Sequence, residues 1–250
     1  MWLERSKLLF GEENMAALQG ANVLVVGLGG VGAYAAEMLV RSGIGKMTIA
    51  DSDCVGESNI NRQLIALHST IGRPKSEVLA ERLLDINPKL DLRVVNDYIK
   101  DEKTDLLLDS EVFDYVIDAI DSLKDKAHLI LEASKSGAKL FASMGAALKL
   151  DPTKVRVAEF WDVKGCPLGA ALRKKFKKDK TYPKRKFKCV YSEELLENKG
   201  EAPEVDGNST WDVKKAQING SLVHITAIFG FTLSGLVVQD VENAIKNKDK

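Results

Sequence analysis

The chain has 250 residues, 45% hydrophobic and 29% charged, so it can form a sizeable core and is not a disordered segment. Lysine plus arginine and aspartate plus glutamate both total 36, which excludes attraction of the whole molecule to nucleic acid or membrane by net charge. Cys54, Cys166 and Cys189 form no CxxC pair, which argues against a disulfide framework and a four-cysteine zinc site.

The first part of the chain alternates short apolar runs with helical patterns. The alternation predicts an α/β fold with a Rossmann-like, doubly wound and mostly parallel sheet. The N-terminus of the chain is charged and lacks the apolar core of a signal peptide, which favours a cytoplasmic protein. We expect strands over 22–27, 46–51, 91–96, 115–121 and 139–145, and helices over 31–41, 72–88 and 124–136.

The pattern changes at about Asp151. A strand is expected over 154–160, followed by a very basic stretch and an apolar helix. We predict one domain over 1–250, with a core over about 1–150 and an irregular C-terminal lobe over about 151–250. Residues 221–238 carry no Lys, Arg, Asp or Glu and are about long enough to span a membrane, but their polar residues and a polar tail favour a buried core or dimer helix.

A glycine motif lies between the first expected strand and helix. Gly27, Gly29 and Gly32 form GxGxxG, which lets backbone approach a phosphate at a helix N-terminus. Asp51 ends the next strand, where a carboxylate can hold ribose hydroxyls. The alternatives are a merely tight turn and a strand-end acid, and the motif does not identify the nucleotide.

The stretch "ESNINRQL" separates this chain from dehydrogenases, which need an apolar slot for nicotinamide. Arg62 can bind phosphate oxygens through two parallel hydrogen bonds, and Asn59 can position another oxygen. Lys75 follows Pro74 in the first turn of a helix, where the helix dipole opposes a cation and a bound polyphosphate would reverse that preference. The alternative is an exposed lysine.

Two acids, Asp118 and Asp121, end the strand expected over 115–121. One can carry Mg²⁺ and the other can cap the following helix. Cationic phosphate ligands together with a metal-binding acid indicate ATP chemistry instead of hydride transfer.

The motifs "GLGGVG", "DSDCVGESNINRQ", "GRPK" and "DAIDS", in this order, resemble the ThiF/MoeB adenylating superfamily, relatives of ubiquitin-activating enzymes. The stretches "LLFGEENMAALQG", "INRQLIAL", "KSEVLAERLLDINP" and "VIDAIDSLKDKAHLI" are similar to one branch, the tRNA threonylcarbamoyladenosine dehydratase (TcdA) family. The resemblance is dense through about residue 150 and looser afterwards.

The resemblance implies a site for ATP and Mg²⁺. Asp51 would hold ribose, Asn59, Arg62 and Lys75 would contact phosphates, and Asp121 would bind the metal. Arg5 would cross a homodimer interface onto the phosphates of the partner. The implied nucleotide-binding residues are Gly27, Gly29, Gly30, Gly32, Asp51, Asp53, Asn59, Arg62, Gln63 and Lys75, and the implied catalytic residues are Arg5, Arg62, Lys75 and Asp121.

The implied reaction is ATP-dependent dehydrative cyclisation of a threonylcarbamoyl side chain in the tRNA anticodon loop, through an acyl-adenylate. Two alternatives are an adenylating activator of a small sulfur-carrier protein and a non-catalytic nucleotide-binding adaptor in a sulfur-transfer complex. Sulfur-transfer proteins are therefore candidate partners. The lack of paired CxxC zinc ligands favours the dehydratase branch, and isolated cysteines weaken a thioester role, for which Cys189 is the least implausible nucleophile.

The run from Arg173 to Lys188 holds ten Lys or Arg residues against one Asp, with Phe176, Tyr182 and Phe187 between them. Such a cluster can follow an RNA backbone and stack unpaired bases. The alternative is a solvated loop. The family resemblance to tRNA-acting enzymes favours RNA.

Overall fold

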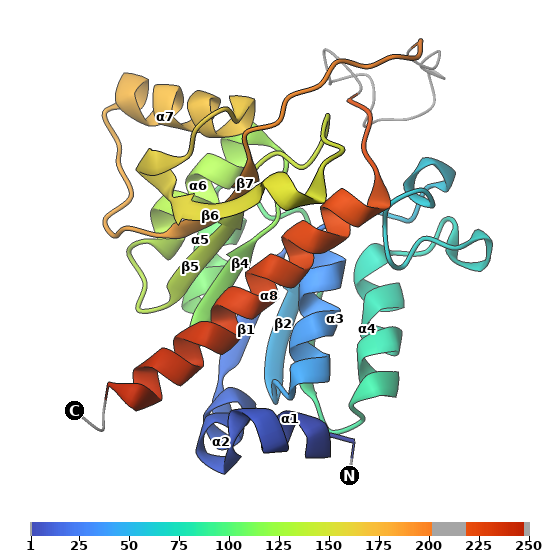
Figure 1. Ribbon diagram of the computed structural model, residues 1–250, viewed down its shortest axis with the longest axis vertical. Coiled ribbons are helices and arrows are strands. Elements are labelled where there is room, and N and C mark those ends of the chain that lie inside the picture. The colour runs from blue at the N-terminus through green and yellow to red at the C-terminus, as the bar shows by residue number, and fades with distance from the viewer. Residues whose placement is uncertain (1, 202–218, 248–250) are drawn as a thin grey trace.

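The computed structural model describes residues 2–201 and 219–247 (Figure 1). Its sheet has seven strands in the order β3-β2-β1-β4-β5-β7-β6. Only β6 is antiparallel to its neighbour, so the predicted doubly wound, mostly parallel sheet is confirmed. The strands are β1 (Asn22–Val26), β2 (Lys46–Ala50), β3 (Asp91–Val95), β4 (Tyr115–Asp118), β5 (Lys139–Ser143), β6 (Val155–Glu159) and β7 (Lys188–Ser192).

Helices cover both faces of the sheet. Val23 and Val25 of β1 belong to one core cluster, and Leu24 and Val26 belong to the other, as expected when side chains alternate across a strand. The first face carries α3 (Gly32–Ser42), α4 (Lys75–Ile86) and α8 (Val223–Lys246), the second carries α5 (Glu102–Asp109), α6 (Leu123–Ala133) and α7 (Pro167–Asp179), and α1 (Glu4–Phe10) and α2 (Glu12–Gly20) precede β1.

Residues after 150 extend the sheet of the first part. β7 pairs in parallel with β5, and β6 pairs with the outer side of β7. β7 is absent from the predicted strands because it follows directly on the basic run, where charge obscures its short apolar pattern. Residues 202–218 of the predicted C-terminal lobe lie outside the described residues.

Helix α8 is the segment with the composition of a membrane span. Within the described residues, α8 alone is long and apolar enough to cross a bilayer, and half of its apolar window is buried. Ile225, Phe229, Leu233 and Val237 lie four residues apart and are fully buried. A Cβ atom at Gly230 would lie 2.6 Å from the carbonyl oxygen of Val31, which directly precedes α3, so α8 and α3 pack closely. This packing supports the core-helix interpretation.

The strand order reverses between β1 and β4, which creates a crevice at the carboxyl ends of these strands. The connections after β1, β2 and β4 therefore meet at one edge, which we call the carboxyl edge. Helices α1 and α2 lie at the opposite edge (Figure 1), where Leu3 and Met15 approach Gly43, just before β2. The two edges of the sheet thus have different partners.

Candidate active site

The glycine turn after β1 is shaped by two of its glycines. Gly27 has φ +88°, and a Cβ atom there would lie 2.8 Å from the carbonyl oxygen of Ala119. A Cβ atom at Gly32 would lie 1.8 Å from the carbonyl oxygen of Gly27. A side chain is therefore excluded at Gly27 by the left-handed backbone and by the turn after β4, and at Gly32 by the close packing of the start of α3 on the glycine turn.

The other two glycines have different surroundings. A Cβ atom at Gly29 would meet a single neighbour, Nε2 of Gln63 at 3.7 Å. A Cβ atom at Gly30 would lie 3.2 Å from Cβ of Thr226 and 3.3 Å from the carbonyl oxygen of Arg62. Gly29 therefore leaves room for a ligand at the start of α3, whereas Gly30 is small because α8 packs against it.

Asp51 ties two parts of the carboxyl edge together. Its Oδ2 accepts a hydrogen bond from the Leu28 backbone N–H at 2.6 Å, and its Oδ1 accepts one from Asp53 N–H at 2.8 Å. Burial raises the pKa of the Asp51 carboxyl, opposed by the nearby charge of Lys75. Each carboxylate oxygen can accept a further bond, so the site fits the predicted contact to ribose hydroxyls.

The "ESNINRQL" segment lies between the glycine turn and the start of α8. Asn59 closes its turn by accepting a hydrogen bond from Gly56 N–H at 3.1 Å. Arg62 Nη1 donates to the Ser58 carbonyl oxygen and to Asn61 Oδ1, both at 2.8 Å. These local bonds orient the guanidinium group, while the backbone of Arg62 packs against Gly30.

Gln63 places a buried hydrogen-bond acceptor in this site. Its side chain is buried, and its Oε1 has no hydrogen-bond partner among residues 2–201 and 219–247. A buried acceptor without a partner is costly, so it points to a missing donor. Ribose hydroxyls and the adenine amine are such donors, and Gln63 lies beside the open face of Gly29. The residues present therefore fit a bound nucleotide.

Lys75 is held inward instead of lying exposed. Only 5% of the residue is accessible, and its Nζ lies 2.8 Å from Asp53 Oδ2. Its backbone N–H also donates to the Asp53 carbonyl oxygen at 2.8 Å. The exposed-lysine alternative is wrong. An ammonium has three donors, so the pair with Asp53 leaves Lys75 able to reach phosphate oxygens.

The two acids after β4 have unlike environments. Asp118 is fully buried, and its Oδ2 lies 2.9 Å from Nζ of Lys126, which is also fully buried. Burial raises the pKa of the Asp118 carboxyl, opposed by the Lys126 charge. Asp121 is exposed at the carboxyl edge. The residue before α6 is Ser122, whose side chain does not cap the helix, and the Asp118 carboxylate pairs with Lys126 and with Ile120 N–H.

The structure adds Tyr98 and Asp125 to this edge. Tyr98 donates a hydrogen bond to Asp125 Oδ2 at 2.8 Å. This bond, burial and the charges of Asp125, Asp53 and Asp121 raise the pKa of Tyr98 to about 12. The loops after β2, β3 and β4 therefore meet here. The sequence offers a signal for Asp125, because it follows Asp121 by one helical turn. No sequence pattern indicates that Tyr98 belongs to the site.

Arg5 is the predicted catalytic residue that lies far from the rest. It is exposed on α1, at the edge of the sheet opposite the glycine turn (Figure 1). The fold therefore does not bring Arg5 to the nucleotide site of its own chain. Its predicted role requires a second copy.

The cysteines give no support to a thioester intermediate. Cys54 is exposed, whereas Cys166 and Cys189 are buried. Burial strongly raises the pKa of the Cys189 thiol, so this sulfur stays protonated and is a weak nucleophile.

The basic run divides between α7 and the loop that leads to β7. Phe176 and Phe187 are buried in the second core cluster, so the prediction that they stack on bases is wrong. Tyr182 is exposed, and its ring centroid lies 6.1 Å from that of Trp161. Arg185 donates to backbone carbonyls that follow α6, which gives it a structural role. Besides Arg185, the exposed cations are Lys174, Lys177, Lys178, Lys180, Lys184, Lys186 and Lys188.

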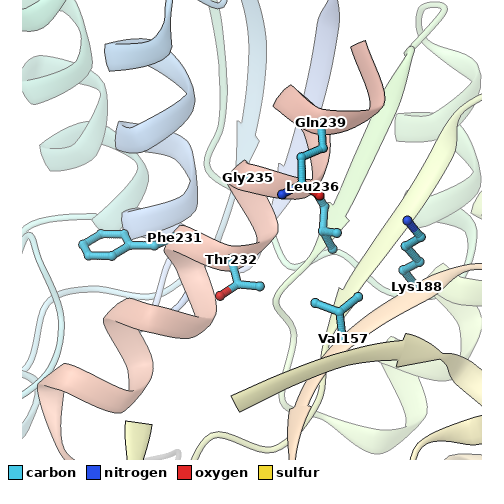
Figure 2. Close-up of a pocket in the computed structure, with 7 residues that line it drawn as sticks. All are labelled: Val157, Lys188, Phe231, Thr232, Gly235, Leu236 and Gln239. Carbon is cyan, nitrogen blue, oxygen red and sulfur yellow. The ribbon is translucent and has the colours of Figure 1, made fainter. Parts of the chain in front are cut away.

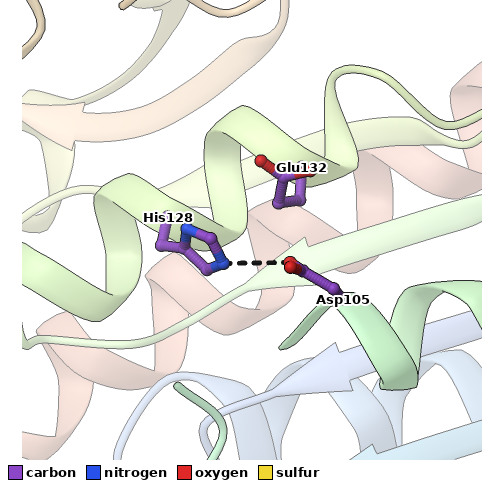
Figure 3. A group of neighbouring side chains, drawn as sticks. All are labelled: Asp105, His128 and Glu132. Carbon is purple, nitrogen blue, oxygen red and sulfur yellow. Dashed lines mark hydrogen bonds and ion pairs between the residues drawn. The ribbon is translucent and has the colours of Figure 1, made fainter. Parts of the chain in front are cut away.

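Two other features lie outside the nucleotide site. Figure 3 shows Asp105, His128 and Glu132, whose ligand atoms lie within 4.8 Å of one another. Nε2 of His128 lies 2.9 Å from Oδ1 of Asp105, and Glu132 forms an ion pair with Lys135, so contacts within the chain account for these side chains. An open groove of about 560 Å³ lies between α8 and the β6–β7 pair. Figure 2 shows the residues that line it, which are Val157, Lys188, Phe231, Thr232, Gly235, Leu236 and Gln239.

Comparison with known proteins identifies relatives of the whole chain. The model of the ThiF family matches residues 3–243. The tRNA threonylcarbamoyladenosine dehydratase of Bacillus subtilis is 35% identical over 247 residues, covering 98% of this chain and 96% of the relative. The Escherichia coli enzyme TcdA, solved in complex with ATP, superposes with a TM-score of 0.84 at 33% identity and covers 97% of this chain and 94% of its own. Molybdopterin-synthase adenylyltransferase of Escherichia coli is 32% identical over 157 residues, which cover 63% of this chain and 61% of the relative.

Proposed function

The chain belongs to the ThiF family, and we propose that it is an ATP-dependent tRNA threonylcarbamoyladenosine dehydratase. One observation carries the proposal: at the switch point of the sheet, the open face of Gly29 lies beside the unpartnered Gln63 acceptor. The buried Lys75–Asp53 pair belongs to the same edge. The Bacillus subtilis dehydratase matches the chain over nearly its whole length, whereas the similarity to molybdopterin-synthase adenylyltransferase covers about three fifths of the chain.

The first step is adenylation of the threonylcarbamoyl carboxylate. Its oxygen attacks the α-phosphate of ATP, and pyrophosphate leaves. No general base is required, because the carboxylate is already ionised at pH 7. Backbone N–H groups at the start of α3, the remaining donors of Lys75 and the guanidinium of Arg62 offset the charge that develops on the phosphates.

We propose Asp121 as the protein ligand of Mg²⁺. Magnesium takes one or two carboxylates together with phosphate oxygens, and a carboxylate at the carboxyl edge suits that preference. Asp118 does not fit this role because its carboxyl is sealed against Lys126. When bound, the ion would add positive charge next to the phosphates.

The second step closes a ring within the substrate. A nucleophilic atom of the same side chain attacks the adenylated carbonyl carbon and releases its proton to solvent, and AMP leaves with the former carboxylate oxygen. The net change in the nucleoside is the loss of one water. Because the nucleophile is tethered, effective molarities can reach about 10⁵ M or more, and no enzyme cysteine takes part.

A product assay tests the proposal. Purified protein, Mg·ATP and tRNA carrying threonylcarbamoyladenosine should give a nucleoside lighter by one water, with AMP and pyrophosphate in equal amounts. Carboxylate labelled with ¹⁸O should transfer the label to AMP. Mass spectrometry of the digested tRNA measures the mass of the nucleoside, and mass spectrometry of the released AMP, separated from the tRNA before digestion, measures the label. An unshifted nucleoside, or release of ADP and phosphate, would show that the substrate or the reaction is different.

A pyrophosphate-exchange assay separates the dehydratase from the two rival functions. An activator of a sulfur-carrier protein would exchange labelled pyrophosphate into ATP with a protein C-terminus and without tRNA. A non-catalytic adaptor would show no exchange with either substrate. Exchange that depends on modified tRNA is the result expected for the dehydratase.

We propose that the basic run contributes to tRNA binding. Seven of its lysines are exposed, and three of them, Lys174, Lys177 and Lys178, lie on α7. This helix follows a loop in which Cys166 approaches Gly145, just past the carboxyl end of β5. Exposed lysines can follow a phosphate backbone without reading sequence. The exposed Tyr182 and Trp161 rings offer stacking surfaces in the same region.

We also propose that the enzyme acts as a homodimer. Arg5 lies at the edge opposite the nucleotide site, and two leucines of the same helix, Leu8 and Leu9, are 88% and 91% exposed. Half-exposed Phe231 borders the groove on α8. Apolar side chains in such positions favour association, and a second copy would allow Arg5 to reach a partner's phosphates.

A further inference from the structure

A lysine and an aspartate are sealed together behind the nucleotide site. Asp118 ends β4, Lys126 lies in the second turn of α6, and neither side chain is accessible to solvent. Nζ and Oδ2 are 2.9 Å apart, so the two groups form a buried ion pair. No part of the adenylation chemistry described above uses this pair.

Both side chains of the pair bind backbone groups of the turn between β4 and α6. Lys126 Nζ donates to the Ile120 carbonyl oxygen at 3.1 Å and approaches the Asp118 carbonyl oxygen at 3.5 Å. Asp118 Oδ1 accepts a hydrogen bond from Ile120 N–H at 3.1 Å. Both backbone groups of Ile120 are therefore fixed, and Asp121 is the next residue.

The turn is also part of the wall of the glycine loop. Ala119 N–H donates to the Val26 carbonyl oxygen at 2.9 Å. The Ala119 carbonyl is the group that a side chain at Gly27 would strike, and its Cβ lies 3.1 Å from a Cβ at Gly32. A shift of the turn would therefore move both the glycine loop and Asp121.

The energetics argue for a role besides stability. Removing two charges from water is expensive, and a buried ion pair is often no more stable than apolar side chains of the same volume. A helix face with Lys126, Ile130 and Ala133 would accept an apolar residue at its first position. A charged pair at this point instead imposes one shape on the turn, because it satisfies specific backbone groups.

We propose that Lys126 and Asp118 are positioning residues for the nucleotide, which hold residues 119–121 in the shape that receives the phosphates and their Mg²⁺. This inference rests on the proposed function. Neither residue touches the substrate. They act through the backbone of Ala119 and Ile120 and through the direction of the Asp121 carboxylate.

The test compares matched double variants. Asp118→Asn/Lys126→Met removes both charges and keeps the acceptor for Ile120 N–H, so no buried charge is left unpaired. The control, Glu37→Gln/Arg82→Met, removes an ion pair between α3 and α4 whose glutamate is similarly buried. Calorimetry should measure ATP binding with and without Mg²⁺, and thermal unfolding should measure stability.

The first double variant should bind Mg·ATP about 10- to 100-fold more weakly, as is typical when a group supporting a ligand-binding residue is removed. The benefit of Mg²⁺ over metal-free ATP should shrink with it, and the control should keep both. If the first variant does not fold, Lys126→Arg keeps the charge but not the contacts of the ammonium, and it should fold and bind Mg·ATP more weakly.

Unchanged Mg·ATP affinity in a folded variant would overturn the positioning role. Failure of both variants to fold would also overturn it, because the pair would then serve stability alone. A wild-type protein that binds no ATP would instead contradict the proposed function, so the two failures are distinguishable.

Discussion

The carboxyl edge of the sheet and the basic run of residues 173–188 both concentrate charge, but they hold it differently. At the edge, Lys75 pairs with Asp53 and Lys126 with Asp118, and these side chains are largely or fully buried. In the basic run, most cations lie exposed on α7 and the following loop. Buried, paired groups suit charge stabilisation in a reaction, whereas exposed groups suit diffuse attraction to a polyanion.

The difference also concerns what each region can recognise. The positions of Gly27, Gly32 and Asp51 depend on backbone contacts across β1, β2 and β4, so small displacements would disturb the site. Among the residues that the structure describes, the lysines of α7 form no such backbone contacts, and Lys175 pairs with Asp179. We therefore expect substitutions at the edge to change catalysis and substitutions in the run to change tRNA affinity.

The largest effect should follow loss of a phosphate ligand at the edge. Lys75→Ala should lower turnover by about 10²–10³-fold, because it deletes charge stabilisation that matters most in the transition state. Asp121→Asn should have a similar effect, with the loss depending on Mg²⁺ concentration. Rates of AMP release measure both, and circular dichroism checks the fold. Lys89→Ala, an exposed lysine after α4, is the matched control; near-normal turnover of Lys75→Ala would refute the site.

A mixing experiment tests whether the edge is complete within one chain. Arg5→Ala and Lys75→Ala should each be inactive alone. If Arg5 acts across a dimer, mixed and re-equilibrated chains should recover roughly a quarter of wild-type activity, because half of the dimers formed by random pairing carry one intact site. Light scattering should show a dimer before and after mixing. No recovery, or an active Arg5→Ala protein, would exclude the trans arrangement.

Charge reversal in the basic run should have a smaller and different effect. Lys174→Glu/Lys177→Glu/Lys178→Glu should weaken tRNA binding across sequences and lower the slope of log affinity against log salt by about two. ATP affinity should stay unchanged, because the nucleotide site uses other segments. Filter binding over a salt series gives the slope. The control Lys89→Glu/Lys135→Glu/Lys246→Glu carries the same change of charge elsewhere on the surface. Equal tRNA affinity and salt dependence of the two variants would show that the basic run is a solvated surface without a specific role in tRNA binding.

The smallest effect is expected at the cysteines. Cys54→Ser/Cys166→Ala/Cys189→Ala should keep most of the activity, because ring closure within the substrate needs no enzyme thiol. The two buried substitutions should each lower the free energy of unfolding by about 1 kcal/mol. Turnover and denaturant unfolding measure the two quantities separately. Loss of turnover in a folded triple variant would revive a thioester route.

The sequence by itself determined the strand–helix alternation, the glycine turn and the clustering of Asn59, Arg62, Gln63 and Lys75 after β2. These features are legible because turn geometry, helix starts and hydrophobic periodicity depend on neighbours in the chain. The resemblance to a family then identified the chemistry, which geometry alone does not name.

Only the tertiary structure decided which of the acids Asp118 and Asp121 is exposed at the carboxyl edge. It also decided which aromatic residues of the basic run are exposed. Asp118 is sealed because Lys126 of the following helix lies against it, and Asp121 stays exposed. Phe176 and Phe187 of the basic run are buried together beneath α7, whereas Tyr182 is not. Arg5 is separated from the site by the height of the sheet. Burial depends on segments distant in sequence, so local patterns cannot predict it.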